Sequence, residues 1–158
     1  MTQVIEAISD TADREIIITR IINAQRELVF RAWTDPEHIG EWWGQTGFTT
    51  TIHSMDVRPG GEWRFIMHGP NGMDFPNLVV YIEIVKPEKL VYMHGDETEP
   101  DQFHVTVTFE KVENKKTRLT MYSLFKTAAA RDLVVREYGA IEGGNQTVDR
   151  LEEYLANA

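Results

Sequence analysis

Residues 128–156 read AAARDLVVREYGAIEGGNQTVDRLEEYLA, the longest helical pattern in the chain. Apolar side chains recur in it every three or four residues, and charged side chains occupy the opposite face. The apolar stripe consists of Val134, Tyr138, Ile141, Val148, Leu151 and Leu155. Gly139, Gly143 and Gly144 interrupt the pattern and together cost about 2–3 kcal/mol of helix propensity relative to alanine. The pattern predicts one long carboxy-terminal helix, and the glycines indicate close packing, a kink or room left beside it.

The residues before this helix read mainly as strands separated by turns. Arg14 to Asn23 is a β-branched run of strand length, and strands alternate with turn residues from Phe48 to Tyr122. Between them, two short helices are predicted over 28–33 and 38–43, divided by Asp35-Pro36, a pair typical of a helix start. This order predicts an α+β helix-grip fold, in which a curved antiparallel sheet of about seven strands wraps around the long carboxy-terminal helix.

Composition narrows the class of protein. The chain has 158 residues, which suits a single domain; we assign residues 14–158 to it and expect residues 1–13 to be a loosely ordered tail. The absence of cysteine excludes a disulfide scaffold, a zinc-thiolate site, an iron–sulfur cluster and a cysteine nucleophile. The net charge of −9 argues against nucleic acid as a partner.

The amino terminus lacks signal-peptide features, and no run reaches the ~18 apolar residues of a membrane span, so a cytoplasmic protein is expected.

No motif indicates a metal, a cofactor or covalent catalysis. His94 lies at a strand end before the acidic segment 96–101, which predicts a solvated loop rather than a metal site. Serines lack the Gly-x-Ser-x-Gly elbow, and no glycine-rich phosphate loop is present. We expect no cofactor and no metal, although a histidine–acid pair assembled only by the fold stays open. The five histidines, none at metal-binding spacing, are His38, His53, His68, His94 and His104.

A set of short motifs follows a fixed order along the chain. They are Asp35-Pro36-Glu37, Trp42-Trp43-Gly44, Pro59-Gly60-Gly61-Glu62-Trp63-Arg64, Pro70-Asn71-Gly72, Pro87-Glu88-Lys89-Leu90-Val91-Tyr92 and Thr117-Arg118-Leu119-Thr120. With this set, the chain resembles the START-like (birch-pollen-allergen-like, helix-grip) superfamily from about Arg14 to Leu155, and within it the branch named after the activator of the heat-shock-protein ATPase. The resemblance implies a cavity between the sheet and the long helix. Such relatives bind lipids, hormones or polyketides, some are cyclases, and some regulate chaperones.

We expect the cavity to bind a small, largely hydrophobic molecule. Many relatives carry Trp after the helix glycine where this chain has Asn145, so a large plug is missing from the helix face. The Asn145 amide is expected to point towards the sheet and to be satisfied by a protein group, water or the ligand. Alternation along strands and spacing along helices predict the lining residues, with a tryptophan at the cavity mouth. They are Trp42, Trp63, Phe65, Met67, Val80, Ile82, Tyr92, Val107, Met121, Tyr138, Ile141 and Asn145.

Two other functions stay open at this point. The alternation of Trp63, Phe65 and Met67 is also typical of a plain core face, which would fill the cavity. A filled cavity favours a protein-binding regulator of a chaperone ATPase that acts through its outer surface. Polar cavity groups such as Tyr92 and Asn145 would instead suit a cyclase-like or hydrolase-like enzyme acting on an aromatic or polyketide substrate. The expected state is a monomer or a weak homodimer.

Overall fold

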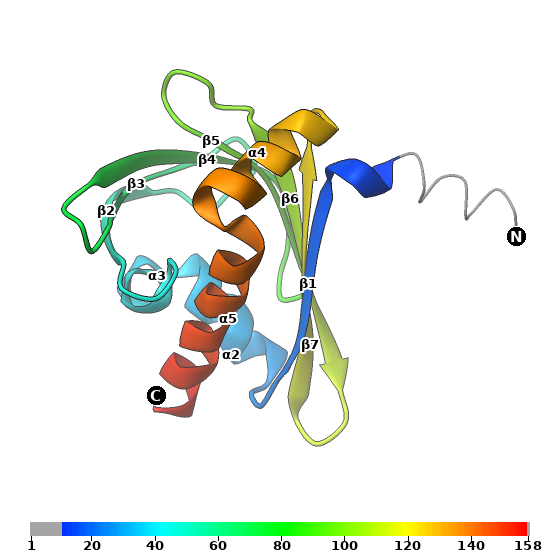
Figure 1. The fold of residues 1–158 in the computed structure, drawn as a ribbon. Helices are drawn as coiled ribbons and strands as arrows, with labels where there is room; N and C mark the ends of the chain where they lie inside the picture. Colours follow the sequence, from blue (N-terminus) through cyan, green and yellow to red (C-terminus); the bar gives the residue numbers. More distant parts are fainter. Residues whose placement is uncertain (1–10, 158) are drawn as a thin grey trace, which may run out of the picture.

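A seven-stranded sheet curves around two carboxy-terminal helices (Figure 1). The structure is a computed structural model and describes residues 11–157. The tail expected over residues 1–13 therefore lies mostly outside the described residues, and Ala12–Arg14 form a short 3-10 helix, η1. None of the helices in residues 11–157 combines the length and the apolar content needed to cross a bilayer.

Every strand is antiparallel to its neighbours, in the order β1-β7-β6-β5-β4-β3-β2. Hairpins join consecutive strands from β2 to β7, and β1 pairs with β7 at the far edge. The expected α+β helix-grip fold is confirmed. The strands are β1 Glu15–Ile22, β2 Thr49–Met55, β3 Glu62–His68, β4 Asp74–Val85, β5 Lys89–Gly95, β6 Phe103–Val112 and β7 Lys116–Phe125.

The carboxy-terminal segment forms two helices where the sequence predicted one. They are α4, Ala128–Tyr138, and α5, Ala140–Ala156. Gly139 separates them with φ 58° and ψ 44°, a left-handed conformation that glycine adopts without a Cβ penalty. Thr127 caps the start of α4, because its hydroxyl accepts a hydrogen bond from Ala130 N at 3.0 Å. The kink expected from the glycines is thus a complete break between two helices.

The other two helix glycines allow α5 to approach its neighbours closely. A Cβ atom on Gly143 would lie 2.5 Å from Gln45 Oε1, and one on Gly144 would lie 2.4 Å from Ile18 Cδ1. Both distances are too short for a side chain without displacement of the neighbour. Gly143 and Gly144 thus let α5 lie close to Gln45 and Ile18, and both glycines also line the pocket described below.

Two short helices, α2 Arg26–Thr34 and α3 Pro36–Trp42, connect β1 to β2 and lie beside α5 (Figure 1). Asp35 starts α3, because its carboxylate accepts a hydrogen bond from Glu37 N at 2.9 Å while Pro36 takes the first helical position. These helices cover one end of the concave face of the sheet.

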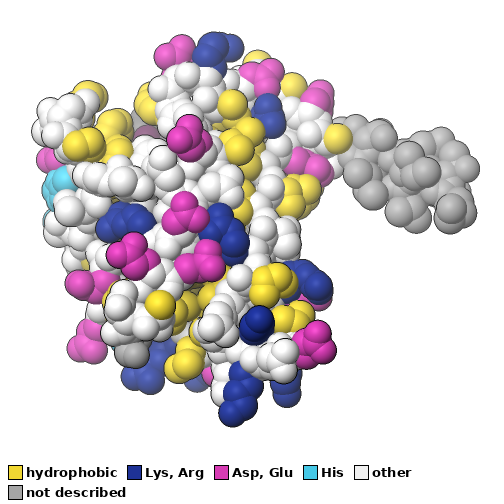
Figure 2. Space-filling view, turned by 60° about the horizontal axis from the view of Figure 1, so that its bottom comes forward, with side chains coloured by type: hydrophobic (Ala, Val, Ile, Leu, Met, Phe, Trp, Pro, Cys, Tyr) yellow, Lys and Arg dark blue, Asp and Glu magenta, His cyan; other side chains and the backbone are white. Residues whose placement is uncertain are grey.

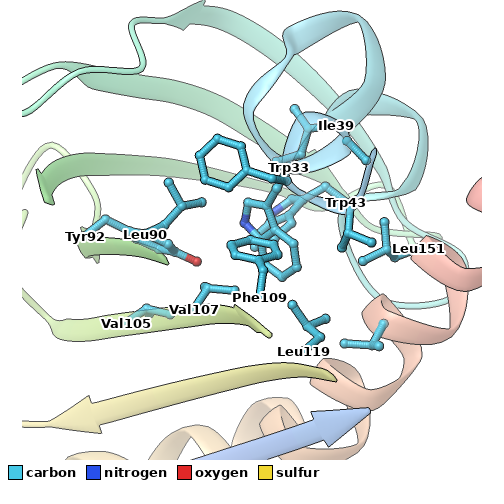
Figure 3. Packing of buried hydrophobic residues seen from close by; sticks show 14 of the residues in the cluster. Trp33, Ile39, Trp43, Leu90, Tyr92, Val105, Val107, Phe109, Leu119 and Leu151 are labelled. Atoms are coloured by element: carbon cyan, nitrogen blue, oxygen red, sulfur yellow. The ribbon is translucent and has the colours of Figure 1, made fainter. Parts of the chain in front are cut away.

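Aromatic rings fill the space between α2, α3 and the sheet. The Trp33 ring meets Trp42, Trp43 and Phe109 edge to face, at centroid distances of 5.0–5.8 Å. Trp43 then contacts Trp63 at 5.2 Å. Figure 3 shows Trp33, Trp43 and Phe109 packed together, and all five rings are buried. We call this group the tryptophan core.

Candidate functional site

A pocket of about 640 Å³ lies between the sheet and the junction of α4 with α5. Strands β3 to β7 form one wall, and α4, α5 and the loop after α3 form the other. Tyr138, which is 62% exposed, lies at its rim. The apolar part of the lining consists mainly of Phe48, Met67, Phe75, Phe103, Phe125 and Val134.

A histidine held by an asparagine is the central polar feature of the pocket wall. Asn77 Nδ2 donates to Phe75 O at 2.8 Å, which leaves Asn77 Oδ1 to accept from His94 Nε2 at 2.8 Å. The His94 ring packs against Phe103 at a centroid distance of 4.9 Å and against Phe65 at 6.0 Å. Burial lowers the pKa of His94 to about 4, so the ring is neutral at pH 7.

The placement of His94 corrects the solvated loop expected from the sequence. His94 belongs to β5, and its Cα pairs with those of Val79 on β4 and Phe103 on β6, in a row that faces the helices. The sequence did contain an indication that His94 faces inward, because Leu90, Tyr92 and His94 alternate along the strand. The acidic residues that follow it obscured this period of two.

A second polar pair closes the end of the pocket nearest the β5–β6 loop. Asp96 Oδ2 accepts from Gln102 Nε2 at 3.2 Å. Asp96 Oδ1 accepts from the backbone N–H groups of Thr98 and Glu99 at 2.9 and 2.8 Å. Because these bonds occupy both carboxylate oxygens, Asp96 serves to shape the loop.

Five of the predicted lining residues are buried in the filled interior instead of the pocket wall. The indole N–H of Trp42 donates to Ala32 O at 3.1 Å, so this residue does not shut a cavity mouth. Met121 packs against the same interior from β7. Met67 and Tyr138 do line the pocket. The five buried residues are Trp42, Trp63, Phe65, Tyr92 and Val107.

Val80 and Ile82 lie on the outer face of the sheet, which corrects their expected facing. Their neighbours Val79 and Tyr81 point inward and are buried, whereas Ile82 is 44% exposed. Residues 78–82 are apolar at every position, so alternation alone does not decide which set faces the helices. A bulge after Tyr81 also shifts the register of β4 against β5.

Ile141 also lies outside the pocket, with 38% of its surface exposed. The break at Gly139 rotates α5 relative to α4, so the stripe predicted for one continuous helix does not continue across it. Val148 and Leu151, further along α5, are buried as the stripe predicts. The predicted stripe is therefore wrong only close to the break at Gly139.

Asn145 faces the edge strand β1 rather than the pocket. Its Nδ2 donates to Ile141 O at 3.0 Å, and its Oδ1 accepts from Arg20 Nη2 at 3.2 Å. Arg20 also forms ion pairs with Asp149 at 2.7 Å and Glu152 at 2.5 Å. A protein group thus satisfies the amide, and neither Asn145 nor the buried Tyr92 lines the pocket. On the face shown in Figure 2, acidic and basic side chains are intermixed.

We expect Asn145→Leu to lower the free energy of unfolding by at most about 1 kcal/mol, because Arg20 keeps its two carboxylate partners. We expect no change in binding of a ligand in the pocket. Asn157→Leu is a matched control: Asn157 makes the same contact to the carbonyl four residues back, at 2.9 Å to Glu153 O, but none to Arg20. Thermal melts and probe titrations measure both effects, and weaker binding in Asn145→Leu alone would contradict this placement.

Three histidine–acid pairs form within residues 11–157. His38 Nε2 is 3.9 Å from Asp35 Oδ2 at the start of α3, where both side chains are half-buried, and the other two pairs lie on the surface. His104 Nε2 is 2.9 Å from Asp101 Oδ1 on the outer face of the sheet. His68 Nδ1 is 2.7 Å from Asp74 Oδ1 near the β3–β4 hairpin. None of these six side chains lines the pocket. Within residues 11–157, no three His, Cys, Asp or Glu side chains gather closely enough to hold a metal ion.

Comparison with known proteins identifies the family. The family model described as Activator of Hsp90 ATPase homolog 1-like protein matches residues 23–156. The chain belongs to this family. Members of the Hsp90-activator-homolog family typically bind hydrophobic ligands or act in chaperone regulation. The resemblance seen in the short motifs is thereby confirmed.

Solved structures of other bacterial proteins have a similar fold. A protein from Nitrosomonas europaea is 25% identical with a TM-score of 0.79, over 92% of this chain and 96% of that one. One from Arthrobacter aurescens is 26% identical with a TM-score of 0.83, over 94% and 90%. One from Mycobacterium smegmatis, 23% identical with a TM-score of 0.83 over 94% of each chain, shares the fold. No curated protein matches the chain.

We expect acid to destabilise the wild-type protein more than it destabilises a His94→Phe variant. The pKa of His94 is about 4 in the folded chain, below its ordinary value of 6.5. The unfolded chain therefore binds this proton at a higher pH than the native state. The resulting stability is fully present above about pH 6.5 and is lost as the pH falls towards 4.

The expected loss between about pH 7 and 4.5 is roughly 2 kcal/mol more for wild type than for His94→Phe, reduced from the full linkage value because the ring is partly exposed at the pocket. Urea unfolding at both pH values measures it. Carboxylates that titrate in this range affect both proteins equally, so the difference isolates His94. Parallel pH profiles would contradict the neutral state of this half-buried ring.

Proposed function

We propose that this protein binds a small, largely apolar molecule in the pocket between the sheet and the α4–α5 junction. The observation that carries this proposal is the contrast between the two ends of the interior. The tryptophan core fills one end, whereas a volume of about 640 Å³ stays open at the other. Small-molecule sites are typically concave spaces of about 300–1,000 Å³ with apolar walls and few polar groups.

The chemistry of the lining supports the same proposal. Rings from Phe48, Phe75, Phe103 and Phe125 offer contact surface from both walls. Burial of apolar area contributes about 25 cal/mol per Å². A second hollow, of about 430 Å³ beside the β4–β5 turn, differs because most of its lining is charged. Membership in a family that typically binds hydrophobic ligands or acts in chaperone regulation agrees with the choice of the first pocket.

We expect Ala140→Phe to weaken binding of the uncharged fluorescent probe 1-N-phenylnaphthylamine at least tenfold, or about 1.4 kcal/mol. Ala140 lines the pocket at the start of α5, so the added ring occupies ligand volume. Ala129→Phe is the matched control, because Ala129 is exposed on α4 and lies outside the pocket. Fluorescence titrations at one temperature give the three dissociation constants.

Circular dichroism melts establish that each variant is folded. Val134→Phe fills the pocket from α4 and carries the same expectation if Ala140→Phe does not fold. Failure of the wild type to bind the probe, or equal affinity in all folded variants, would contradict the proposal.

The description of the family model supports a second candidate function, regulation of a chaperone ATPase. Exposed apolar side chains on β1 and β4, among them Ile17, Ile21 and Ile82, offer contacts on the outer face. A purified chaperone of the Hsp90 class, assayed for ATP hydrolysis with and without this protein, tests it. Stimulated hydrolysis supports this candidate, and an unchanged rate contradicts it.

A further inference from the structure

His94 gives the pocket wall a hydrogen-bond acceptor that the fold leaves free. A neutral imidazole has one N–H donor and one bare nitrogen. His94 Nε2 faces Asn77 Oδ1, an acceptor whose orientation is set by the bond from Asn77 Nδ2 to Phe75 O. The proton therefore resides on Nε2, and Nδ1 carries a lone pair.

Nδ1 of His94 is accessible from the pocket. Among residues 11–157 it has no hydrogen-bond partner, and it is not one of the buried polar atoms that lack partners. Those atoms include the Tyr92 hydroxyl and the Trp33 indole nitrogen, both in the filled interior. Because His94 lines the pocket, a ligand there is within reach of this nitrogen.

The charges around the pocket favour an uncharged ligand over an anion. The charged side chains of the lining are Asp96 and Glu137, both acidic, and the described lining contains no lysine or arginine. A carboxylate ligand at neutral pH would bring negative charge towards both and would offer no proton to His94. An uncharged apolar molecule with a hydroxyl, an amide N–H or an arylamine N–H meets neither obstacle.

We propose that the ligand is an uncharged, largely apolar molecule with one O–H or N–H donor, and that His94 Nδ1 accepts a hydrogen bond from this donor. The inference rests on the proposed function and names its ligand class. The lowered pKa of His94 agrees with it, because an unprotonated ring accepts a hydrogen bond throughout the neutral range. A ligand without a donor would displace water from Nδ1 and leave the nitrogen unpaired, which disfavours its binding.

Three naphthalene derivatives of similar size test the ligand class by calorimetric titration at pH 7. They are 2-naphthol, which has a donor, 2-methoxynaphthalene, which has none, and 2-naphthoate, which is an anion. We expect the wild type to bind 2-naphthol about tenfold more tightly than 2-methoxynaphthalene, and 2-naphthoate most weakly. In His94→Phe, which keeps a ring against Phe103, we expect the affinities of the two uncharged probes to agree within about twofold.

Nitrogen-15 NMR of the wild type gives a second readout that needs no variant. We expect the His94 shifts to show a proton on Nε2 and a bare Nδ1, and we expect the Nδ1 resonance to move on addition of 2-naphthol but not of 2-methoxynaphthalene. Equal wild-type affinities for the two uncharged probes, or a proton on Nδ1, would overturn this inference while the proposed function stands. If none of the three derivatives binds, the proposed function fails together with it.

Discussion

We expect Trp33→Ala to lower the free energy of unfolding by about 3–5 kcal/mol, the usual cost of truncating a buried tryptophan. Trp33 is 1% exposed, and its ring lies edge to face against Trp42, Trp43 and Phe109. These neighbours are large, flat rings held from several elements, so they do not collapse into the space left behind. For a domain of this size, the loss corresponds to a melting temperature lower by about 6–20 °C.

Leu28→Ala is the control for this truncation. Leu28 belongs to the same helix, α2, but is 52% exposed, so the change should stay within about 0.5 kcal/mol. Trp33 does not line the pocket, and we expect the folded Trp33→Ala variant to keep its affinity for 1-N-phenylnaphthylamine. A melting temperature equal to that of the Leu28→Ala variant would show that the tryptophan core is not tightly filled. Lost binding in the folded variant would show that core and pocket are not separate.

The order of elements was predictable because local chemistry decides it. Turns rich in proline and glycine separate the strands, and Asp35-Pro36 divides the two short helices. The break at Gly139 was not predictable in the same way, because three glycines weaken the same helix and only one of them adopts the left-handed conformation. The facing of β4 was not predictable either, since its apolar run from 78 to 82 fits both faces.

The site was harder to predict than the fold, because its position depends on which inward-facing side chains other elements cover. Trp63 and Met67 share one face of β3, yet the tryptophan core buries the first and the second lines the pocket. This division depends on where α2 and α3 pack, which strand alternation does not contain. The inward facing of His94 was predictable from the sequence, because this residue continues the inward alternation of Leu90 and Tyr92.

We expect Arg150→Met to lower the free energy of unfolding by about 2–3 kcal/mol and the melting temperature by about 4–12 °C. Arg150 Nη1 lies 3.0–3.3 Å from the carbonyl oxygens of Trp43, Gly44, Gln45 and Phe48. Its two protons are shared among these four acceptors. Burial lowers the pKa of Arg150, and the charge of Glu153 opposes this shift in part. The four carbonyl oxygens solvate the guanidinium group. Methionine keeps the apolar stem but leaves the carbonyl groups without this donor.

The same substitution should weaken binding of 1-N-phenylnaphthylamine, because the loop that Arg150 holds carries Gln45 and Phe48 into the pocket wall. Arg150→Lys keeps the charge on a shorter, non-planar group. Its melting temperature and its affinity for the probe should therefore lie between those of the wild type and Arg150→Met. Arg136→Met is the control, since Arg136 is 68% exposed and, among residues 11–157, pairs only with Glu137 at 3.7 Å. If Arg150→Met melts and binds like Arg136→Met, another contact holds the loop. The bonds from Thr46 N to Gln146 Oε1 at 3.1 Å and from Thr50 Oγ1 to Trp43 O at 3.0 Å are contacts that would remain to do so.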